Sequence, residues 1–469
     1  MNSLRNAFPG PASTIRYIDL LPWLLIAAAI GLVAMLSVER QFDHDEFEAV
    51  KSAWKIFVGE RIYIDFFQHH HPLLYYSLTP LFSLFGETKT TLFVARAMMF
   101  AFTLGSLVIV HELARRVFSR KVAAVSILFL MSISLFVEKT IEVRPDVPQT
   151  FFGLLSVLLL YRFFDSERRH LLLLSALSLG VGFLFQQRQV VLIALVYAVL
   201  AHRVLRGRLR LSLVLQFSAV LMSTWGIYCA YLAYTGELSR YWILNFELNL
   251  LTLETRGQRQ LGRLASNIAG FNSVVLLGLL LGLPATRTRS QRELALTAIA
   301  LVAFALLHRV QFAQYYMMAL PFVAIIAANG WETIARRDSV AGAACLVAAF
   351  AVAAADYTYD IRYRTNQFQL DRIEYVLENT RPSDYVYDGD IEFNLFRKDL
   401  DFFWFSVGRR RGLERYRVLK GYQYDIYEII AEYKPKMISN FAIEDMKHPV
   451  IGDHYREDRV FRGLYLRVD

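Results

Sequence analysis

A dense group of acids and imidazoles lies between residues 42 and 71, directly after an apolar run that is long enough to cross a membrane. Its most reactive members are, in chain order, Asp43, Asp45, Glu46, His69, His70 and His71. A carboxylate in a partly dry pocket can take a proton from a hydroxyl group, and carboxylates and imidazoles are common metal ligands. These residue types therefore indicate general-base catalysis, metal binding or both, close to a bilayer surface.

Each of these residues also has a simpler interpretation. Asp45 and Glu46 could form the solvated first turn of a helix, where negative charge suits the helix dipole. The three consecutive histidines cannot all bind one metal, because only His69 and His71 would share a face of an extended segment. The alternative for them is a hydrogen-bonding patch at the membrane interface.

Further charged groups lie at the ends of apolar runs or inside them. Asp146 comes just before Pro148 and could be a site residue or a helix N-cap. Arg188 and Arg309 could bind an anion or could snorkel at the end of a span. Arg96 lies inside a span, where a charge usually faces the protein interior or a water-filled cavity.

Polar residues from five distant segments fall on one predicted face of the membrane. The segments are 42–71, 137–148, 186–189, 234–270 and 308–316. This gathering favours one site at the outer interface over scattered solubilising charges. The residues that we expect to contact a substrate there are Asp65, His70, Arg144 and Tyr315.

The whole chain is apolar enough to be a membrane protein. It has 469 residues, of which 55% are hydrophobic, and a soluble domain rarely sustains that fraction. The formal net charge of +9 comes from basic residues in short loops, which indicates membrane topology and no nucleic-acid partner. The two cysteines, Cys229 and Cys345, lie in apolar segments, so no disulfide framework is implied.

The sequence predicts an α-helical polytopic membrane protein with about 11 transmembrane helices, the first of them a retained anchor. The predicted spans are 17–37, 91–112, 122–137, 147–163, 170–185, 190–204, 211–233, 271–285, 293–307, 316–331 and 339–355. Lysines and arginines concentrate in alternate loops, which places the N-terminus in the cytoplasm. Residues 38–90 and 356–469 are then outside.

Other segments are predicted to lie outside the bilayer. Glu46–Val58, Leu73–Phe85, Leu238–Leu253 and Arg256–Ile268 are expected to be interfacial helices on the outer face. We divide the chain into a transmembrane part, 1–355, and a small soluble α/β domain, 356–469. Within the latter, 367–380 should form an amphipathic helix, and 383–390 and 435–441 should contain strands.

The order of these motifs resembles a known superfamily. The chain has "DE" after the first span, the aromatic-rich "YIDFFQHHHPLLYY", an arginine early in the next span and "RPD" in the second outer loop. This order is similar to the polyprenyl-phosphate-dependent glycosyltransferases of the C-type (GT-C) fold, such as the lipid A aminoarabinose transferases and protein O-mannosyltransferases. The resemblance covers about residues 17–330.

The resemblance implies roles for individual residues. Asp45 matches the catalytic base, with Glu46 beside it, although Asp43 could be the base instead. Asp146 matches an acid near a metal or the acceptor. The candidate ligands of a divalent metal, Mg or Mn, are Asp146, His69 and His71, and whether a metal is needed is left open.

The same resemblance implies the reaction. The donor would be a sugar on a polyprenyl phosphate, undecaprenyl phosphate in a bacterium, and the acceptor would be a hydroxyl of a lipid, glycan or protein. A single displacement would invert the anomeric centre, and positive charge would stabilise the leaving phosphate. The candidates for that charge are Arg188, Arg96 and Arg309. The protein would lie in the inner membrane, with its catalytic face and C-terminal domain in the periplasm.

Two rival classes remain open. A transporter or lipid flippase usually carries charges near mid-span or broken helices at the bilayer centre, and here only Arg96 is deep. An enzyme like the O-antigen ligases would use a diphosphate-linked donor, and such enzymes typically carry one large outer loop late in the chain. Consumption of a labelled polyprenyl-phosphate sugar would separate these classes from the favoured function.

Overall fold

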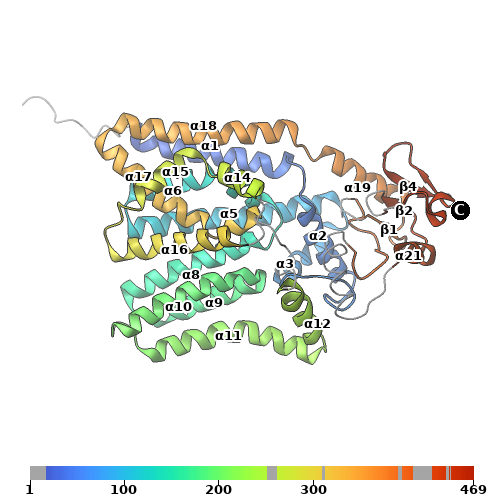
Figure 1. The fold of residues 1–469 in the computed structure, drawn as a ribbon, viewed down its shortest axis with the longest axis horizontal. Coiled ribbons are helices and arrows are strands. Elements are labelled where there is room, and N and C mark those ends of the chain that lie inside the picture. The colour runs from blue at the N-terminus through green and yellow to red at the C-terminus, as the bar shows by residue number, and fades with distance from the viewer. Residues whose placement is uncertain are drawn as a thin grey trace, which may run out of the picture.

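The computed structural model describes residues 17–250, 261–308, 312–388, 393–404, 425–439, 443 and 445–468. Within these ranges the chain is mainly helical, with long helices side by side in a bundle and a small sheet beyond one end of it (Figure 1). Arg309, one of the expected phosphate-binding residues, lies outside the described ranges.

Seven helices in the described part of the chain are long and apolar enough to cross a membrane. They are α1 (Tyr17–Glu39), α5 (Lys89–Val117), α8 (Asp146–Ser166), α10 (Val190–Leu205) with the preceding turn η1 (Gln187–Gln189), α11 (Leu211–Tyr234), α16 (Arg289–Leu307) and α18 (Ser339–Tyr363). The helices α6 (Arg120–Met131) and α7 (Ser134–Ile141) meet at 71° and make an eighth span if they are counted as one. The chain is thus a multi-pass membrane protein by the length and composition of its helices.

The predicted count of eleven spans is not confirmed, although every predicted span contains a helix. Two of these helices, α9 (Arg169–Phe185) and α15 (Ser273–Gly282), are apolar but short. A third, α17 (Leu320–Arg337), ends in the charged sequence "WETIARR" and is not among the seven. Hydropathy identified the helices correctly, whereas length and terminal charge decide which of them qualify as spans.

The helices α15 and α17 cross with their backbones in contact. A Cβ atom built on Gly330 would lie 1.9 Å from the carbonyl oxygen of Gly278, and one on Gly282 would lie 1.9 Å from that of Ile326. Small residues allow such a close approach between helices in a membrane, where packing replaces the hydrophobic effect as the driving force.

Short helices gather at the end of the bundle nearest the sheet (Figure 1). They are α2 (His44–Phe57), α3 (Leu73–Leu78), α4 (Pro80–Phe85), α12 (Leu238–Trp242) with the π-helical turn η2 (Ile243–Glu247), and α14 (Leu261–Ala269). The predicted helix at 46–58 is confirmed as α2, which buries Phe47, Val50 and Trp54. The predicted helix at 73–85 is broken at Thr79, because Pro80 starts a new helix.

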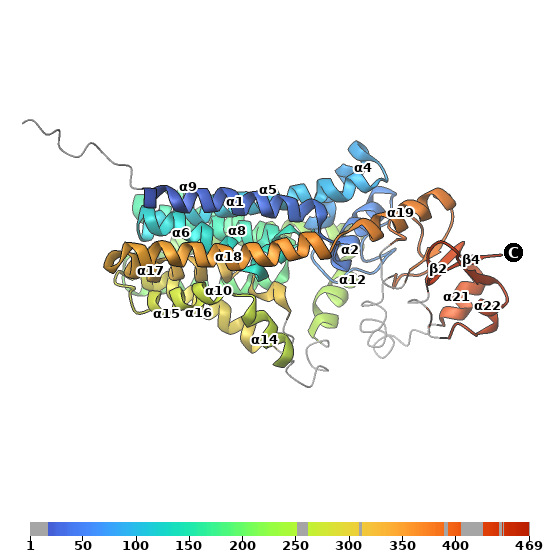
Figure 2. The same cartoon turned by 90° about the horizontal axis from the view of Figure 1, so that it is seen from above.

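The C-terminal part forms a four-stranded sheet with short helices around it. Its elements are α19 (Gln367–Asn379), β1 (Val386–Tyr387), α21 (Ile426–Tyr433), β2 (Met437–Ser439), α22 (Pro449–Gly452), β3 (Tyr455–Glu457) and β4 (Leu464–Arg467). The strand order is β1-β2-β4-β3, with β1 and β2 parallel and the other pairs antiparallel. The predicted amphipathic helix and the two predicted strands are confirmed, while α18 runs through the predicted boundary at 355/356 and leads into α19 (Figure 2).

Candidate functional site

The start of α2 is fixed by Asp43, the N-cap residue. Its side chain accepts from the backbone N–H of Asp45 at 3.0 Å, and its own N–H donates to Glu46 Oε1 at 2.9 Å. This capping box satisfies backbone donors that would otherwise lack partners. Asp43 therefore caps the helix that carries Asp45, whether or not it is also the alternative base.

Glu46 and Arg96 form a buried ion pair between α2 and α5. Arg96 donates from Nε at 2.8 Å and from Nη2 at 2.7 Å to the two oxygens of Glu46. Its remaining N–H groups donate to the backbone carbonyls of Ser37, Arg40 and Gln41. With all its donors engaged, Arg96 fixes α2 against the end of α1. This geometry favours a positioning role for both side chains, where we expected catalysis and phosphate binding.

Asp45 lies in the first turn of α2, between two cationic partners. Its Oδ2 is 2.5 Å from Nη2 of Arg144, and its Oδ1 is 3.0 Å from Nε2 of His44. Burial would raise the pKa of Asp45, but the charge of Arg144 and the hydrogen bond from His44 hold it well below its usual range. The same hydrogen bond raises the pKa of His44 to about 9. Asp45 is therefore an ionised carboxylate at neutral pH.

The second outer loop brings Arg144 and Asp146 beside Asp45, and η1 brings Arg188. Arg188 Nη2 lies 2.5 Å from Asp146 Oδ1, and Arg144 Nε lies 3.7 Å from Asp146 Oδ2. Arg144 Nε and Arg188 Nη1 are buried and have no hydrogen-bond partner in the described part of the chain. Two guanidinium N–H groups around one carboxylate therefore lack acceptors. The guanidinium of Arg188 also lies over the ring of Tyr315, 4.3 Å from its centroid.

The three histidines are neutral, and within their loop His71 is buried while His69 and His70 are half-buried. His71 donates from Nδ1 to the carbonyl of Phe183 at 2.6 Å, and its Nε2 accepts from the hydroxyl of Tyr241 at 3.0 Å. His69 and His70 have their ring centroids 4.0 Å apart. Burial lowers the pKa of His69 and of His71 to about 4, and that of His70 well below its usual range. Uncharged imidazoles can still donate or accept hydrogen bonds to a ligand.

The expected metal ligands are not brought together. Among the described residues, the group of three side chains that could hold an ion is Asp43, His44 and Asp45, whose ligand atoms lie within 4.8 Å of one another. It contains none of Asp146, His69 and His71, because both ring nitrogens of His71 are engaged and Asp146 is paired with Arg188.

The observed cluster has the ligand types for a small cation but fits one poorly in this arrangement. His44 carries a proton at neutral pH, since its pKa is about 9, and Arg144 already neutralises Asp45. A divalent ion would have to displace both the proton and the guanidinium. The chemistry below is therefore carried by the side chains alone.

Asp65, expected to contact substrate, instead caps a turn. Its carboxylate accepts from the backbone N–H of Arg61 at 2.7 Å and pairs with the exposed side chain of that residue. Tyr63, within the turn, has a φ of 70° and donates from its hydroxyl to the carbonyl of His70 at 2.8 Å. A bulky residue at positive φ is strained, so the surrounding contacts must hold this turn in place.

One carboxyl group at the site was missed by the sequence reasoning. Glu48 lies one turn after Asp45 on α2, is buried, and accepts from Gln68 Nε2 at 2.9 Å. Burial first, and the charge of Asp45 second, raise the pKa of Glu48 to about 8. The spacing of three residues from Asp45 was the available signal, because such residues share a helix face.

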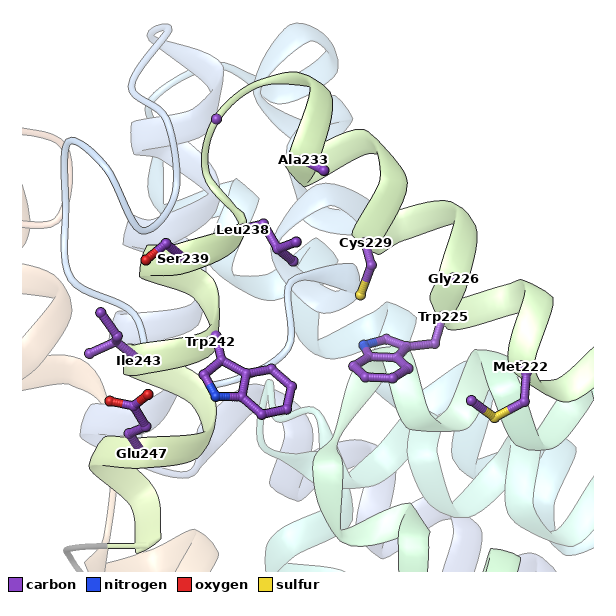
Figure 3. Close-up of a pocket in the computed structure, with 11 residues that line it drawn as sticks. Met222, Trp225, Gly226, Cys229, Ala233, Leu238, Ser239, Trp242, Ile243 and Glu247 are labelled. Carbon is purple, nitrogen blue, oxygen red and sulfur yellow. The ribbon is translucent and has the colours of Figure 1, made fainter.

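An apolar groove of about 980 Å³ runs between α11 and α12 (Figure 3). Its lining includes Met222, Trp225 and Cys229 on α11 and Leu238 and Trp242 on α12. The indole N–H of Trp225 donates to the hydroxyl of Tyr241 at 3.1 Å, and that hydroxyl contacts His71. A groove of this composition suits a lipid chain, and Tyr241 lies between it and the histidine loop.

Residues 69–244 match the sequence model of the dolichyl-phosphate-mannose-protein mannosyltransferase family. A search of curated proteins found no match.

Three solved structures have the same fold. ArnT from Cupriavidus metallidurans bound to undecaprenyl phosphate is 15% identical, with a TM-score of 0.63 over 80% of this chain and 84% of that one. Archaeal oligosaccharyltransferase AglB from Archaeoglobus fulgidus, in complex with an inhibitory peptide and a dolichol-phosphate, is 13% identical, with a TM-score of 0.60 over 97% of this chain and 74% of that one. A complex of the A. fulgidus enzyme with Zn and sulfate is 13% identical, with a TM-score of 0.55 over 92% and 71%. The predicted resemblance to the GT-C glycosyltransferases is confirmed.

Proposed function

We propose that this chain is an inverting glycosyltransferase that moves a sugar from a polyprenyl phosphate, undecaprenyl phosphate in a bacterial membrane, to a hydroxyl of a lipid, glycan or protein. One observation carries the proposal. The buried N–H groups of Arg144 and Arg188 that lack acceptors surround Asp146, and the ionised carboxylate of Asp45 lies on the other side of Arg144. An anion binder and a proton acceptor are thus adjacent.

The two arginines would hold the phosphate of the donor. Guanidinium groups bind phosphate oxygens through strong, directional hydrogen bonds, and buried donors without partners have the most to gain from an anion. As the bond from the sugar C1 to the phosphate oxygen breaks, negative charge grows on that oxygen, and fixed donors stabilise it. Arg96 is assigned to positioning instead, because Glu46 and backbone carbonyls use all its N–H groups.

Asp45 would accept the proton of the acceptor hydroxyl while its oxygen forms the new bond to C1. A single displacement of this kind inverts the anomeric centre. A carboxylate with a lowered pKa is a weak base, but glycosyl transfer passes through an oxocarbenium-like transition state in which the leaving group departs early. For such a transition state, the position and ionisation of the base matter more than its basicity. Asp45 is ionised because of Arg144 and His44.

The lipid part of the donor would lie in the groove between α11 and α12, whose lining is mostly apolar (Figure 3). The fold of ArnT, captured with undecaprenyl phosphate, and of AglB, captured with a dolichol-phosphate, supports a lipid-linked donor. The bias of basic residues among the loops supports placing the site on the periplasmic face of the inner membrane. A Mg or Mn ion would compete with Arg144 for Asp45 and is not needed for this scheme.

Purified protein in lipid nanodiscs, incubated with a panel of radiolabelled undecaprenyl-phosphate sugars and a cell-envelope extract that supplies hydroxyl acceptors, tests the proposal. Time-dependent release of undecaprenyl phosphate from at least one donor, lost in Asp45→Asn, is the expected result. Turnover of diphosphate-linked donors only would favour the ligase-like class. Movement of an intact lipid-linked sugar across the bilayer without cleavage would favour a flippase.

A further inference from the structure

The C-terminal segment 393–404 packs against the back of α2. On that side α2 presents Lys51 and Lys55, which lie one turn apart and are both buried. Asp399 receives both ammonium groups, with Lys51 Nζ 2.6 Å from Oδ1 and Lys55 Nζ 3.0 Å from Oδ2. Its side chain is 1% exposed. A single carboxylate of the C-terminal part thus pairs with both buried lysines on the helix that carries Asp45, and Lys55 also pairs with Glu60, with Nζ 3.0 Å from Oε2.

Two further groups complete the surroundings of these lysines. Lys51 also donates to the carbonyl of Asn394 at 2.8 Å, and Asn394 Nδ2 donates to Asp399 Oδ1 at 2.8 Å. The indole ring of Trp404 lies 5.5 Å from Lys51 Nζ and 5.6 Å from Lys55 Nζ, within the range of a cation–π interaction. The carboxylate is therefore held in one orientation, and both ammonium groups are almost fully buried.

The same segment binds the loop that leads to the three histidines. The backbone N–H of Phe67 donates to the carbonyl of Phe402 at 2.9 Å, and Trp404 Nε1 donates to the carbonyl of Phe67 at 3.0 Å. The next residue, Gln68, donates to Glu48 on α2 and accepts from the N–H of His69 at 2.8 Å. The loop is thus fixed between the C-terminal segment and α2.

We propose that segment 393–404 positions the candidate active site and that Asp399 is its central positioning residue. Without the carboxylate, the buried ammonium group of Lys51 would lose its ion-pair partner and that of Lys55 would keep only Glu60, so α2 would have to shift to hydrate Lys51. Such a shift moves Asp45 away from Arg144, because the two lie on different loops. The effect on turnover rests on the proposed function, whereas the effect on α2 and the loop does not.

Hydrogen exchange read by mass spectrometry on the full-length protein in nanodiscs tests the positioning directly. Asp399→Asn should exchange at least tenfold faster in peptides covering α2 and residues 66–71, while α8 stays unchanged. Asp399→Glu, which keeps the charge, should restore most of the protection. Arg397→Gln is the matched control, because Arg397 is also buried and donates its hydrogen bonds within the C-terminal part, to Thr380, Leu377 and Phe396, while its contact with Glu87 is a long pair of 3.9 Å. This variant should speed hydrogen exchange in residues 367–404 only.

Turnover gives the second measurement. With any donor that the wild type accepts, Asp399→Asn should lower kcat about 10- to 100-fold and change KM for the donor less, since misplaced catalytic groups slow the reaction more than binding. If Asp399→Asn does not fold, Trp404→Phe removes the hydrogen bond to Phe67 together with part of the indole ring beside the lysines, and it should speed exchange in residues 66–71 while α8 stays unchanged. Unchanged exchange in α2 and the loop of folded Asp399→Asn, or equal loosening in Arg397→Gln, would overturn the proposal. A wild type that turns over no donor, with these exchange differences intact, would count against the proposed function only.

Discussion

Nη2 of Arg144 lies 2.5 Å from Oδ2 of Asp45, and this contact joins the two outer loops that the candidate site needs. Asp45 begins α2 in the first loop, and Arg144 lies in the second loop just before α8. In the proposed function, the proton acceptor Asp45 and the phosphate-binding site at Asp146 therefore lie on opposite sides of the Arg144 guanidinium group.

Asp45→Asn should lower turnover about 100- to 10,000-fold, the usual cost of removing a general base. Donor binding should persist, because the phosphate-binding arginines are untouched. Asp43→Asn is the matched comparison, since asparagine also caps helices well and should leave the fold intact. If Asp43→Asn is inactive and Asp45→Asn active, Asp43 is the base. If both are active, Asp146 becomes the acid to test.

Arg188→Ala should weaken binding of undecaprenyl phosphate by about 2–4 kcal/mol, because a buried donor to a phosphate is lost and Asp146 is left with fewer partners. A fluorescence titration with undecaprenyl phosphate measures this. Arg203→Ala is the control, because Arg203 lies at the other end of α10 and pairs with Glu293. Equal affinity in the two variants would leave Arg188 as a snorkelling residue.

Glu48→Gln should stabilise the protein increasingly as pH rises from about 5 to 8. The folded state keeps a proton on Glu48 up to a pKa of about 8, while in the unfolded chain the carboxyl has its ordinary pKa of 4.5. Between these values the unfolded state binds fewer protons, so the unfolding free energy of the wild type falls by about 1.4 kcal/mol for each unit of rising pH. Glutamine has no such dependence and still accepts from Gln68.

The measurement for Glu48 is the difference in Tm between variant and wild type at pH 5, 6.5 and 8. Glu374→Gln serves as the control, because Glu374 pairs with Lys89 on the exposed surface. A Tm difference for Glu48→Gln that is flat across this range would mean that the carboxyl is already ionised at pH 5.

Removal of divalent ions should leave turnover unchanged at pH 7, because Arg144 and protonated His44 already neutralise the acids at the start of α2. The assay compares activity with EDTA and with added Mg or Mn. Binding of Mn, followed by electron paramagnetic resonance, should strengthen as pH approaches 9 and His44 loses its proton. Activity that disappears with EDTA and returns with Mn would contradict the scheme.

Cysteines at Arg61 and Ser383, both exposed in the structure, should react with an impermeant maleimide in intact cells. A cysteine at Ser166, in a loop predicted to be cytoplasmic, should react only after lysis. Cys229 and Cys345 must first be replaced by serine, because both thiols are free. Protection of position 61 or 383 until lysis would reverse the predicted orientation.

The sequence was sufficient to predict which helix ends contribute residues to the candidate site, because hydropathy along the chain locates those ends. Asp45, Arg144, Asp146 and Arg188 all lie at helix ends that hydropathy could locate, and a common membrane face brings such ends together. The fold class followed from the order of the same motifs.

The remaining parts depend on contacts between distant segments. The sequence does not reveal that the guanidinium group of Arg96 donates to Glu46, which lies 50 residues earlier in the chain. This ion pair is what argues against the phosphate-binding role expected for Arg96. The metal role expected for His71 has the same difficulty. Its two ring nitrogens are hydrogen-bonded to Phe183 and Tyr241, which lie 112 and 170 residues further along the chain. Pairing at such separations leaves no periodicity in the sequence.

The hydrogen bond from Trp404 to Phe67 spans 337 positions of the chain, so the order of synthesis matters. A ribosome adding about 5–20 residues per second needs roughly 15–70 s to make the stretch between them. During that interval α2 and the histidine loop have already been made, yet Lys51 and Lys55 still lack Asp399. By this scheme the nascent protein would acquire its working geometry only after translation has passed residue 404, so a premature stop codon before position 399 would remove both Asp399 and Trp404 from the candidate site.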